Sequence, residues 1–327
     1  MSASLRRLLK TSSTPPSSVV DRALGLGGPA LEYHVLDVFS ERPFEGNPLA
    51  VVLGADPLSA AQLQTLAREF HLSETAFPMQ PSVAEAADGA DYRLRIFTPE
   101  VELPFAGHPS VGTACLLTQL GQLAKRQVRQ ACGAGVLPLD VDEDGGRATL
   151  TGGAPVVGGP VDPAEALHAV GLEAADLLGP PSVLAGTGLP YVVVPVTADG
   201  LGRAAPDLSA LKQLFRHPEQ ATGVYLVAWA PGAGAPTTVR ARMFAGDVGV
   251  AEDPATGSAA LALGAALPSM VDVGDGETQL AVTQGVEMGR PSSLSVQVDV
   301  VAGRATRVRV SGGAVRVASG RVAVPPA

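Results

Sequence analysis

The chain has 327 residues, a formal net charge of −9 at pH 7, 38 glycines and 28 prolines, and 46% of its residues are hydrophobic. Two domains are the usual expectation for this length, and the acidic balance argues against a nucleic-acid partner, because phosphate binding needs a basic surface. No apolar run is long enough to predict a membrane span. The two cysteines, Cys115 and Cys132, predict free buried thiols in a reducing compartment, with neither a disulfide framework nor a metal site.

The first thirty residues differ in composition from the rest of the chain. Residues 1–20 hold three basic side chains, six serines and two threonines, and they contain no acidic residue. This composition is typical of an organellar transit peptide, and a disordered tail or a start codon assigned too far upstream would look the same. We therefore expect residues 1–30 to lie outside the fold. The location is cytoplasmic on this reading, or organellar if the segment is a transit peptide.

Alternation of apolar and polar residues predicts mostly strands in the first half. Ser59 is expected to cap a helix that ends at His71, and a second helix is expected from about Ser110 to Leu120, with Gly121 following its last residue. Turns or loops are expected at residues 40–48 and 84–91. The predicted strands of this half are residues 34–39, 49–53, 73–79, 92–97, 127–131, 135–141 and 147–151.

The second half begins with a segment rich in glycine and proline, residues 152–163, which we interpret as a linker between two lobes. Asp162 and Pro163 then start a helix that runs to Gly171. Two further helices are expected at residues 207–217 and 258–267. The predicted strands are residues 191–196, 224–230, 238–244, 279–283, 293–300, 306–310, 314–317 and 322–324.

An internal repeat relates the two halves. Arg93, Arg95 and Phe97 recur 147 positions later as Arg240, Arg242 and Phe244. In each copy the strand is followed by a polar loop with Gly and Pro, at residues 105–112 and 252–259, and each loop opens a helix. Such self-similarity predicts two similar lobes that share one site.

Each of these loops places a glycine, Gly107 or Gly257, beside the start of a helix. Free N–H groups and the positive end of the helix dipole favour an anion there. Neither loop has the pattern of a nucleotide-binding loop, so a carboxylate or an enolate is the expected ligand. A single loop of this kind is more often only a turn, and the matched pair is what favours a functional site.

Four side chains near these elements are candidates for proton chemistry or substrate binding. His108 is expected in a loop, where it suits proton handling or substrate orientation. Asp253 either starts a turn or orients a base, and Ser258 either caps its helix or binds a substrate oxygen. From the residues alone, Glu74 is expected on the solvent face of its strand. In a pocket its pKa would rise, as suits a general base. Together they indicate a proton-transfer site that needs no cofactor and no metal.

The sequence resembles the phenazine-biosynthesis PhzF-like isomerase family. The similarity runs from about residue 33 to the end in the order of that family. The matching stretches are Asp37-Val38-Phe39, residues 44–51 (Phe-Glu-Gly-Asn-Pro-Leu-Ala-Val), Ser73-Glu74-Thr75-Ala76-Phe77, residues 95–99, residues 103–109 (Leu-Pro-Phe-Ala-Gly-His-Pro), residues 252–259 (Glu-Asp-Pro-Ala-Thr-Gly-Ser-Ala) and residues 284–292.

The resemblance implies an α+β protein with the diaminopimelate-epimerase-like fold. Two pseudo-symmetric lobes, residues 31–152 and 153–327, would each be a β-barrel-like sheet around a central helix, with the last strand crossing back to the first lobe and the site in the cleft between lobes. It also implies a homodimer and a cofactor-free isomerase that shifts a proton on a small carboxylate or carbonyl substrate. The implied catalytic residues are Glu74, His108 and Asp253, and the implied substrate-binding residues are Gly107, Ser110, Gly257 and Ser258.

One departure separates the chain from the epimerases and racemases of that fold, which carry a cysteine in each loop. Ala106 and Pro254 stand at those places, and Cys115 follows one or two turns too late. Two opposed bases are therefore missing, which favours a one-base proton shift over inversion. The alternatives are an epimerase with an unrecognised second base and a silent binding or regulatory protein. The sequence does not identify the substrate.

Overall fold

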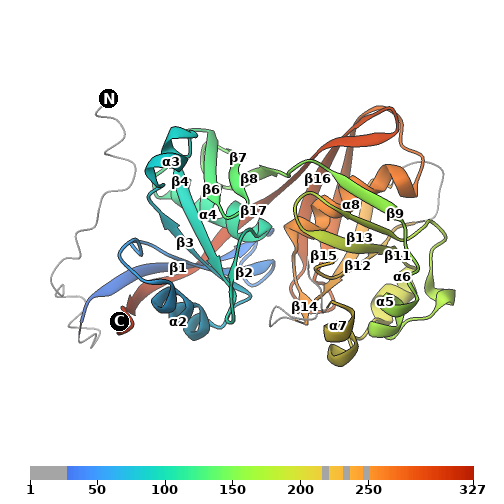
Figure 1. The fold of residues 1–327 in the computed structure, drawn as a ribbon, viewed down its shortest axis with the longest axis horizontal. Coiled ribbons are helices and arrows are strands. Elements are labelled where there is room, and N and C mark those ends of the chain that lie inside the picture. Colours follow the sequence, from blue (N-terminus) through green and yellow to red (C-terminus); the bar gives the residue numbers. More distant parts are fainter. Residues whose placement is uncertain (1–27, 216–220, 231–235, 246–250) are drawn as a thin grey trace. The chain divides into compact units, whose positions relative to one another are not determined.

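The computed structural model describes residues 28–215, 221–230, 236–245 and 251–327 (Figure 1). They form two compact units. The first comprises residues up to 44 together with 48–148 and 313–327, and the second comprises residues 45–47 and 149–312. The sequence placed the division after residue 152. The predicted tail or transit peptide lies almost wholly outside the described residues.

The first unit contains a long buried helix and a set of short strands. The helix is α4 (Gly107–Gln119), in which every residue from Gly107 to Leu117 is buried. A helix that is buried on all sides is surrounded by other elements, and α4 contacts β1, β3 and β7. The other elements are β1 (Ala30–Val38), β2 (Asn47–Val52), α2 (Ala60–Phe70), β3 (Glu74–Met79), α3 (Val83–Ala87), β4 (Tyr92–Phe97), β5 (Glu102–Leu103), β6 (Gln127–Cys132), β7 (Gly135–Val141) and β8 (Arg147–Thr151).

The second unit has the same kind of centre. Its buried helix is α8 (Gly257–Met270), which contacts β10, β16 and β11. Gly264 allows this packing, since a Cβ there would lie 2.5 Å from Val308 Cγ1. The other elements are β9 (Val156–Pro160), α5 (Ala164–Ala169), η2 (Ala174–Asp176), β10 (Val183–Gly186), β11 (Pro190–Pro195), α6 (Ala198–Arg203), α7 (Leu208–Leu214), β12 (Val224–Ala228), β13 (Thr238–Phe244), β14 (Glu252–Asp253), β15 (Gly276–Gln284), β16 (Ser292–Val301) and β17 (Arg304–Ala323).

Strand pairing follows the same order in both units. In the first, β3 lies parallel to β2 and antiparallel to β4, and β4 also pairs antiparallel with β5 and parallel with β6. In the second, β12 lies parallel to β11 and antiparallel to β13, and β13 also pairs antiparallel with β14 and parallel with β15. The sequence repeat at Arg93 and Arg240 therefore falls on strands with equivalent neighbours.

Several predicted boundaries are confirmed. Ser59 caps α2 by accepting a hydrogen bond from the Gln62 backbone N–H, and His71 ends the helix in the left-handed conformation. Gly121 follows α4 with a positive φ of 67°. The strand predicted at residues 92–97 is β4, and the one at 238–244 is β13.

Other predictions were wrong for identifiable reasons. The expected loop at 84–91 contains α3, because Ser82 and Glu85 form a reciprocal capping box. The expected linker contains β9, which pairs with β10. The last three predicted strands are one strand, β17, which pairs first with β16 and then with β1. These long-range pairings keep β17 extended through Gly312 and Gly313.

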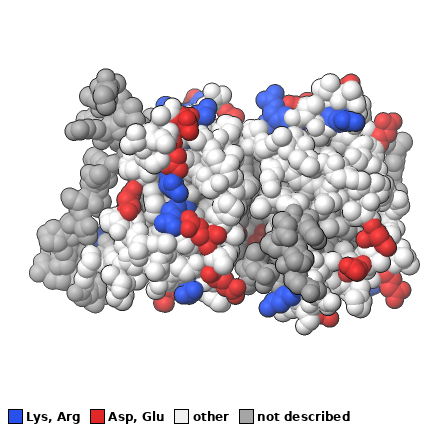
Figure 2. All heavy atoms as spheres, in the orientation of Figure 1, with Lys and Arg blue, Asp and Glu red and all other residues white. Residues whose placement is uncertain are grey.

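Acidic and basic side chains lie close together on the face drawn in Figure 2, among the residues that the structure describes. Ion pairs among the described residues include that of Lys125 with Asp91 at 2.7 Å and that of Arg309 with Asp299 at 2.7 Å. Within the described part of the chain, no helix is both long enough and apolar enough to cross a membrane.

Candidate active site

The first group of candidate residues lies in the first unit, where β3 begins and α4 begins. Glu74 is the first residue of β3, and His108 is the second residue of α4. Their side chains meet with 3.3 Å between His108 Nε2 and Glu74 Oε2. The side chains are 4% exposed for His108 and 16% for Glu74. The solvent-face position expected for Glu74 from the residues alone was therefore wrong.

His108 does not lie in a loop, as the sequence predicted. The helix α4 begins at Gly107, after Ala106, which keeps an extended conformation. Pro109 fits the first helical turn because its missing N–H would have no partner within the helix. Burial disfavours the charged imidazolium and lowers the pKa of His108 to about 3. A neutral imidazole therefore faces the Glu74 carboxyl near pH 7.

Ser110 takes part in a buried network that fixes the start of α4. Its Oγ donates to the Ala106 carbonyl at 2.9 Å and accepts from Gln130 Nε2 at 2.9 Å. The Oε1 atom of Gln130 in turn accepts from the Tyr92 hydroxyl at 2.9 Å. The strand β6 thus holds the helix N-terminus, with Gly107 and its backbone N–H at the first helical position.

The second group lies in the second unit and centres on Asp253, the last residue of β14. Its Oδ1 accepts a hydrogen bond from Asn47 Nδ2 at 2.8 Å, and its Oδ2 accepts one from Thr256 Oγ1 at 2.6 Å. Burial raises the pKa of Asp253 to about 6, and the bonds from Thr256 and Asn47 oppose this rise. The carboxyl is therefore oriented on both oxygens, and its proton affinity lies near the physiological range.

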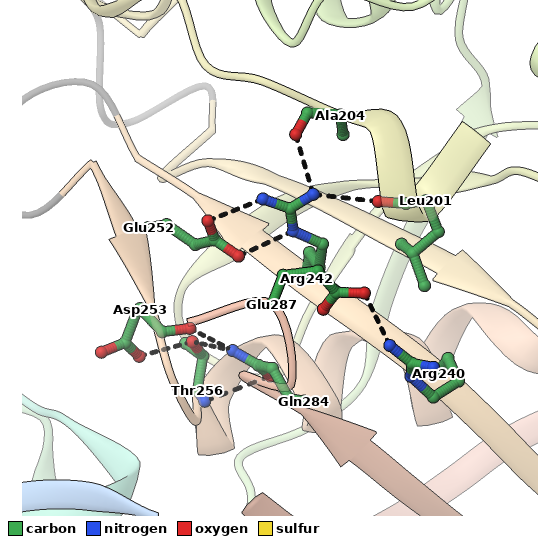
Figure 3. Close-up of polar contacts among 9 residues, drawn as sticks. All are labelled: Leu201, Ala204, Arg240, Arg242, Glu252, Asp253, Thr256, Gln284 and Glu287. Atoms are coloured by element: carbon green, nitrogen blue, oxygen red, sulfur yellow. Dashed lines mark hydrogen bonds and ion pairs between the residues drawn. The ribbon is translucent and has the colours of Figure 1, made fainter. Parts of the chain in front are cut away.

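Gln284 on β15 ties Asp253 to the start of α8 (Figure 3). Its Nε2 donates to the Asp253 carbonyl at 2.7 Å and to Thr256 Oγ1 at 3.0 Å. Its Oε1 accepts from the Thr256 backbone N–H at 3.3 Å and from the Tyr225 hydroxyl at 3.2 Å. Sequence reasoning did not single out Asn47, Thr256 or Gln284, although all three stand within the stretches that carry the family resemblance.

Gly257 and Ser258 are the first two residues of α8, and Thr256 occupies the N-cap position. The prediction that Ser258 caps this helix was therefore wrong. Its Oγ lies 2.7 Å from the Tyr191 hydroxyl instead, and both side chains are buried. The backbone N–H groups of the first turn of α8 have no acceptor within the helix, as is also the case at the start of α4.

No group of three or more His, Cys, Asp and Glu side chains with the geometry of a metal site is found among the described residues. Cys115 and Cys132 are buried and free, as predicted. Burial raises the pKa of the Cys115 thiol to about 12, so the thiolate needed for nucleophilic chemistry does not form near neutral pH.

Comparisons with known proteins agree with this fold. The family described as phenazine biosynthesis-like protein matches residues 36–320. A trans-2,3-dihydro-3-hydroxyanthranilate isomerase from Pseudomonas chlororaphis is 35% identical over 304 residues, which cover 89% of this chain and 98% of that protein. A PhzF-family phenazine biosynthesis protein from Bacillus anthracis has a similar structure, with a TM-score of 0.77 and 29% identity over 90% of this chain and 99% of that one. A hydroxyproline epimerase from Agrobacterium vitis shares the fold at 16% identity, with a TM-score of 0.59 over 90% of this chain and 93% of that chain.

Proposed function

The chain belongs to the PhzF family of phenazine biosynthesis-like proteins and is an isomerase, and we propose that it shifts a proton on a small carboxylate substrate with Glu74 as the base. The observation that carries this proposal is the contact of 3.3 Å between Glu74 Oε2 and His108 Nε2, two side chains that are largely withdrawn from water. General bases need a defined position close to the proton that they remove, and this contact supplies one.

In the proposed reaction, the Glu74 carboxylate takes a proton from a carbon next to a carbonyl or carboxylate group. The electron pair of the broken C–H bond passes to the carbonyl oxygen and forms an enolate. Glu74 then returns the proton to another carbon of the same conjugated system, and the electron pair moves back into a new C–H bond. Atoms and charge balance within the substrate and Glu74, so the proposed step requires no cofactor.

His108 suits a supporting role because its imidazole is neutral near pH 7. A neutral ring carries one N–H donor and one acceptor nitrogen, so it can orient Glu74 without holding it permanently as an ion pair. We assign Asp253 to a proton relay or to substrate orientation. Its raised pKa of about 6 leaves both protonation states accessible near neutral pH.

The starts of α4 and α8 are proposed to bind the negative charges of the substrate. Gly107 and Gly257 are the first residues of their helices, and such N–H groups stabilise a carboxylate or a developing enolate. Ser110 and Ser258 are assigned to the same binding role through their position in the first turns. We also propose a homodimer, as the family resemblance implies.

The first substrate to test is trans-2,3-dihydro-3-hydroxyanthranilate, the compound named for the Pseudomonas chlororaphis relative. Turnover of this compound and of related cyclic unsaturated carboxylates should be followed by ultraviolet absorbance and proton NMR. We expect Glu74→Gln to lower kcat by about 10²–10⁴, which is the usual contribution of a general base. Glu69→Gln, at an exposed position of α2, is the matched control and should turn over normally. Full turnover by Glu74→Gln would exclude the assigned role.

A further inference from the structure

Three residues from early in the chain, Glu45–Asn47, belong to the second unit, and we call them the strap. Arg290 holds the strap by two bonds to its backbone. Its Nε donates to the Gly46 carbonyl at 2.8 Å, and its Nη2 donates to the Glu45 carbonyl at 2.8 Å. The Gly46 N–H in turn donates to the Pro291 carbonyl at 3.1 Å. The planar guanidinium is well suited to binding two acceptors at once.

The strap ends in Asn47, whose side-chain amide reaches Asp253. Its Nδ2 donates to Asp253 Oδ1 at 2.8 Å and to the Ala255 carbonyl at 3.0 Å. Asn47 is fully buried. Both hydrogens of the Asn47 side-chain amide are therefore donated, one to Asp253 and one to the Ala255 carbonyl. Because the side chain is short, the position of the Asn47 backbone decides whether these two bonds can form.

We propose that Arg290 is a positioning residue, which acts through the strap and Asn47 to orient the carboxyl of Asp253. This inference rests on the role proposed above for Asp253. The new element is that Arg290, which does not contact Asp253 in either of its two bonds to the strap, fixes the carbonyls of Glu45 and Gly46 and thereby the position of Asn47. Arg290 makes this contribution through its contacts with the strap, 244 and 245 positions away in the sequence.

Several titratable and charged groups lie around Asp253 and influence its titration as well. Glu252 is its neighbour on β14 and is paired with Arg242, with 2.7 Å between Glu252 Oε1 and Arg242 Nε. Tyr225 approaches through its bond to Gln284 Oε1. A substitution at Arg290 does not replace any of these side chains, but it removes a positive charge. A direct effect of that charge on Asp253 would add to the effect of Asn47→Ala in a double variant, whereas an effect transmitted through the strap and Asn47 would not.

The test is the pH titration of the Asp253 side-chain carboxyl, followed by ¹³C NMR of the full chain labelled at aspartate. The variant Asp253→Asn identifies the resonance. Asn47→Ala removes a hydrogen bond that favours the carboxylate, and we expect the proton affinity of Asp253 to rise roughly three- to tenfold, the equivalent of one net hydrogen bond. Arg290→Ala should raise it in the same direction, and the double variant should rise no further than Asn47→Ala alone.

Arg240→Ala is the matched control. Arg240 forms an ion pair with Glu287, with 2.6 Å between Arg240 Nη2 and Glu287 Oε1. Glu287 is three residues before Arg290 in the sequence and is not part of the strap. The substitution should leave the Asp253 titration unchanged. If Arg290→Ala does not fold, Arg290→Lys serves instead, since a single ammonium replaces the two-armed contact, and it should give a smaller rise.

An unchanged titration in Arg290→Ala or Arg290→Lys, beside a shifted one in Asn47→Ala, would overturn the inference. So would an unchanged titration in Asn47→Ala. The measurement needs no substrate, so its failure is distinguishable from failure of the proposed function, which would appear as normal turnover in Glu74→Gln.

Discussion

The two units have equivalent strand pairings, yet they carry different chemistry at equivalent positions. Thr75 pairs with Phe97 in the first unit, and Val224 pairs with Phe244 in the second, so Glu74 is equivalent to Gly223. By the same comparison of registers, Leu103 of β5 is equivalent to Asp253 of β14.

The helices differ in the same way. His108 and Ser258 are the second residues of α4 and α8. The first unit therefore has the carboxyl of Glu74 beside the imidazole of His108. The second unit has the carboxyl of Asp253 on β14, which is not the position equivalent to Glu74, and the hydroxyl of Ser258 on α8.

Gly223 shows why the second unit lacks a counterpart of Glu74. A Cβ at this position would lie 2.5 Å from the Phe244 carbonyl oxygen, so no side chain fits without movement of the backbone. A base at this position of the second unit would require rebuilding β12. This asymmetry supports a one-base reaction and agrees with the absence of cysteine at Ala106 and Pro254.

A second comparison concerns an arginine shared by the two units. Arg95 pairs with Glu102 and stacks on Phe97 at 5.1 Å, and Arg242 pairs with Glu252 and stacks on Phe244 at 4.9 Å. The pair in the second unit is more deeply buried, with side chains 6% and 14% exposed against 19% and 39%. Arg242 also donates to the carbonyls of Leu201 and Ala204 at the end of α6 (Figure 3).

The largest expected effect on stability comes from replacing Arg242, and Arg95 supplies the comparison. Arg242→Met leaves Glu252 and two carbonyls without their buried donor, and we expect a loss of about 3–5 kcal/mol in the free energy of unfolding. Arg95→Met removes a more exposed pair and should cost about 1 kcal/mol or less. Urea unfolding of both variants measures the difference. Equal losses would show that the deeper burial of the Arg242–Glu252 pair does not make it contribute more to stability than the Arg95–Glu102 pair.

The second largest expected effect comes from Gly223→Ala, which tests whether steric crowding keeps a side chain out of this position. Gly223→Ala forces a Cβ against the Phe244 carbonyl, and overpacking of this kind costs about 1–3 kcal/mol. The control is Gly274→Ala, because no heavy atom lies within 4 Å of a Cβ placed there. A variant Gly223→Ala as stable as Gly274→Ala would remove the steric reason for the asymmetry.

The titratable groups of the two units, His108 and Asp253, should show opposite pH dependence. His108 has its pKa lowered to about 3 in the fold, against about 6.5 in an unfolded chain. Its contribution to stability is complete above pH 6.5 and is lost as pH falls towards 3. The stability difference between wild type and His108→Gln should therefore decrease as pH falls over this interval, by up to about 1.4 kcal/mol per pH unit. A constant difference would show that the ring is not held neutral.

Asp253 has the opposite sign. Its pKa is raised to about 6 in the fold, so its contribution is complete below the unfolded pKa of about 3.9 and is lost as pH rises through 6. The difference between wild type and Asp253→Asn should fall as pH rises over that interval, again measured by urea unfolding. A difference that grew with pH would mean that the bonds from Asn47 and Thr256 outweigh burial.

Local sequence patterns predicted most of the elements because their causes are local. The cap at Ser59 and the alternation in β4 and β13 depend on neighbouring residues only. The continuity of β17 depends on pairing with β16 and then β1, which no local pattern records.

The candidate residues of the site could be identified from the sequence, but their burial and hydrogen-bond partners could not be predicted. His108 was expected in a loop because Gly107 and Pro109 flank it, whereas packing of α4 buries it. Asn47 and Asp253 are 206 positions apart, so their bond could not be predicted from the chain alone.

The central claim is that the Glu74 carboxyl takes the proton from one carbon of the substrate and delivers it to another. The most direct measurement uses substrate deuterated at the carbon that loses its proton, incubated with wild type in ordinary water and followed by NMR. We predict that part of the label reappears at the new position of the product, because one carboxyl carries it, and that Glu74→Gln forms product about 10²–10⁴ times more slowly than wild type. Product formation by Glu74→Gln at the wild-type rate, or inversion of the labelled carbon with complete loss of the label, would contradict the account.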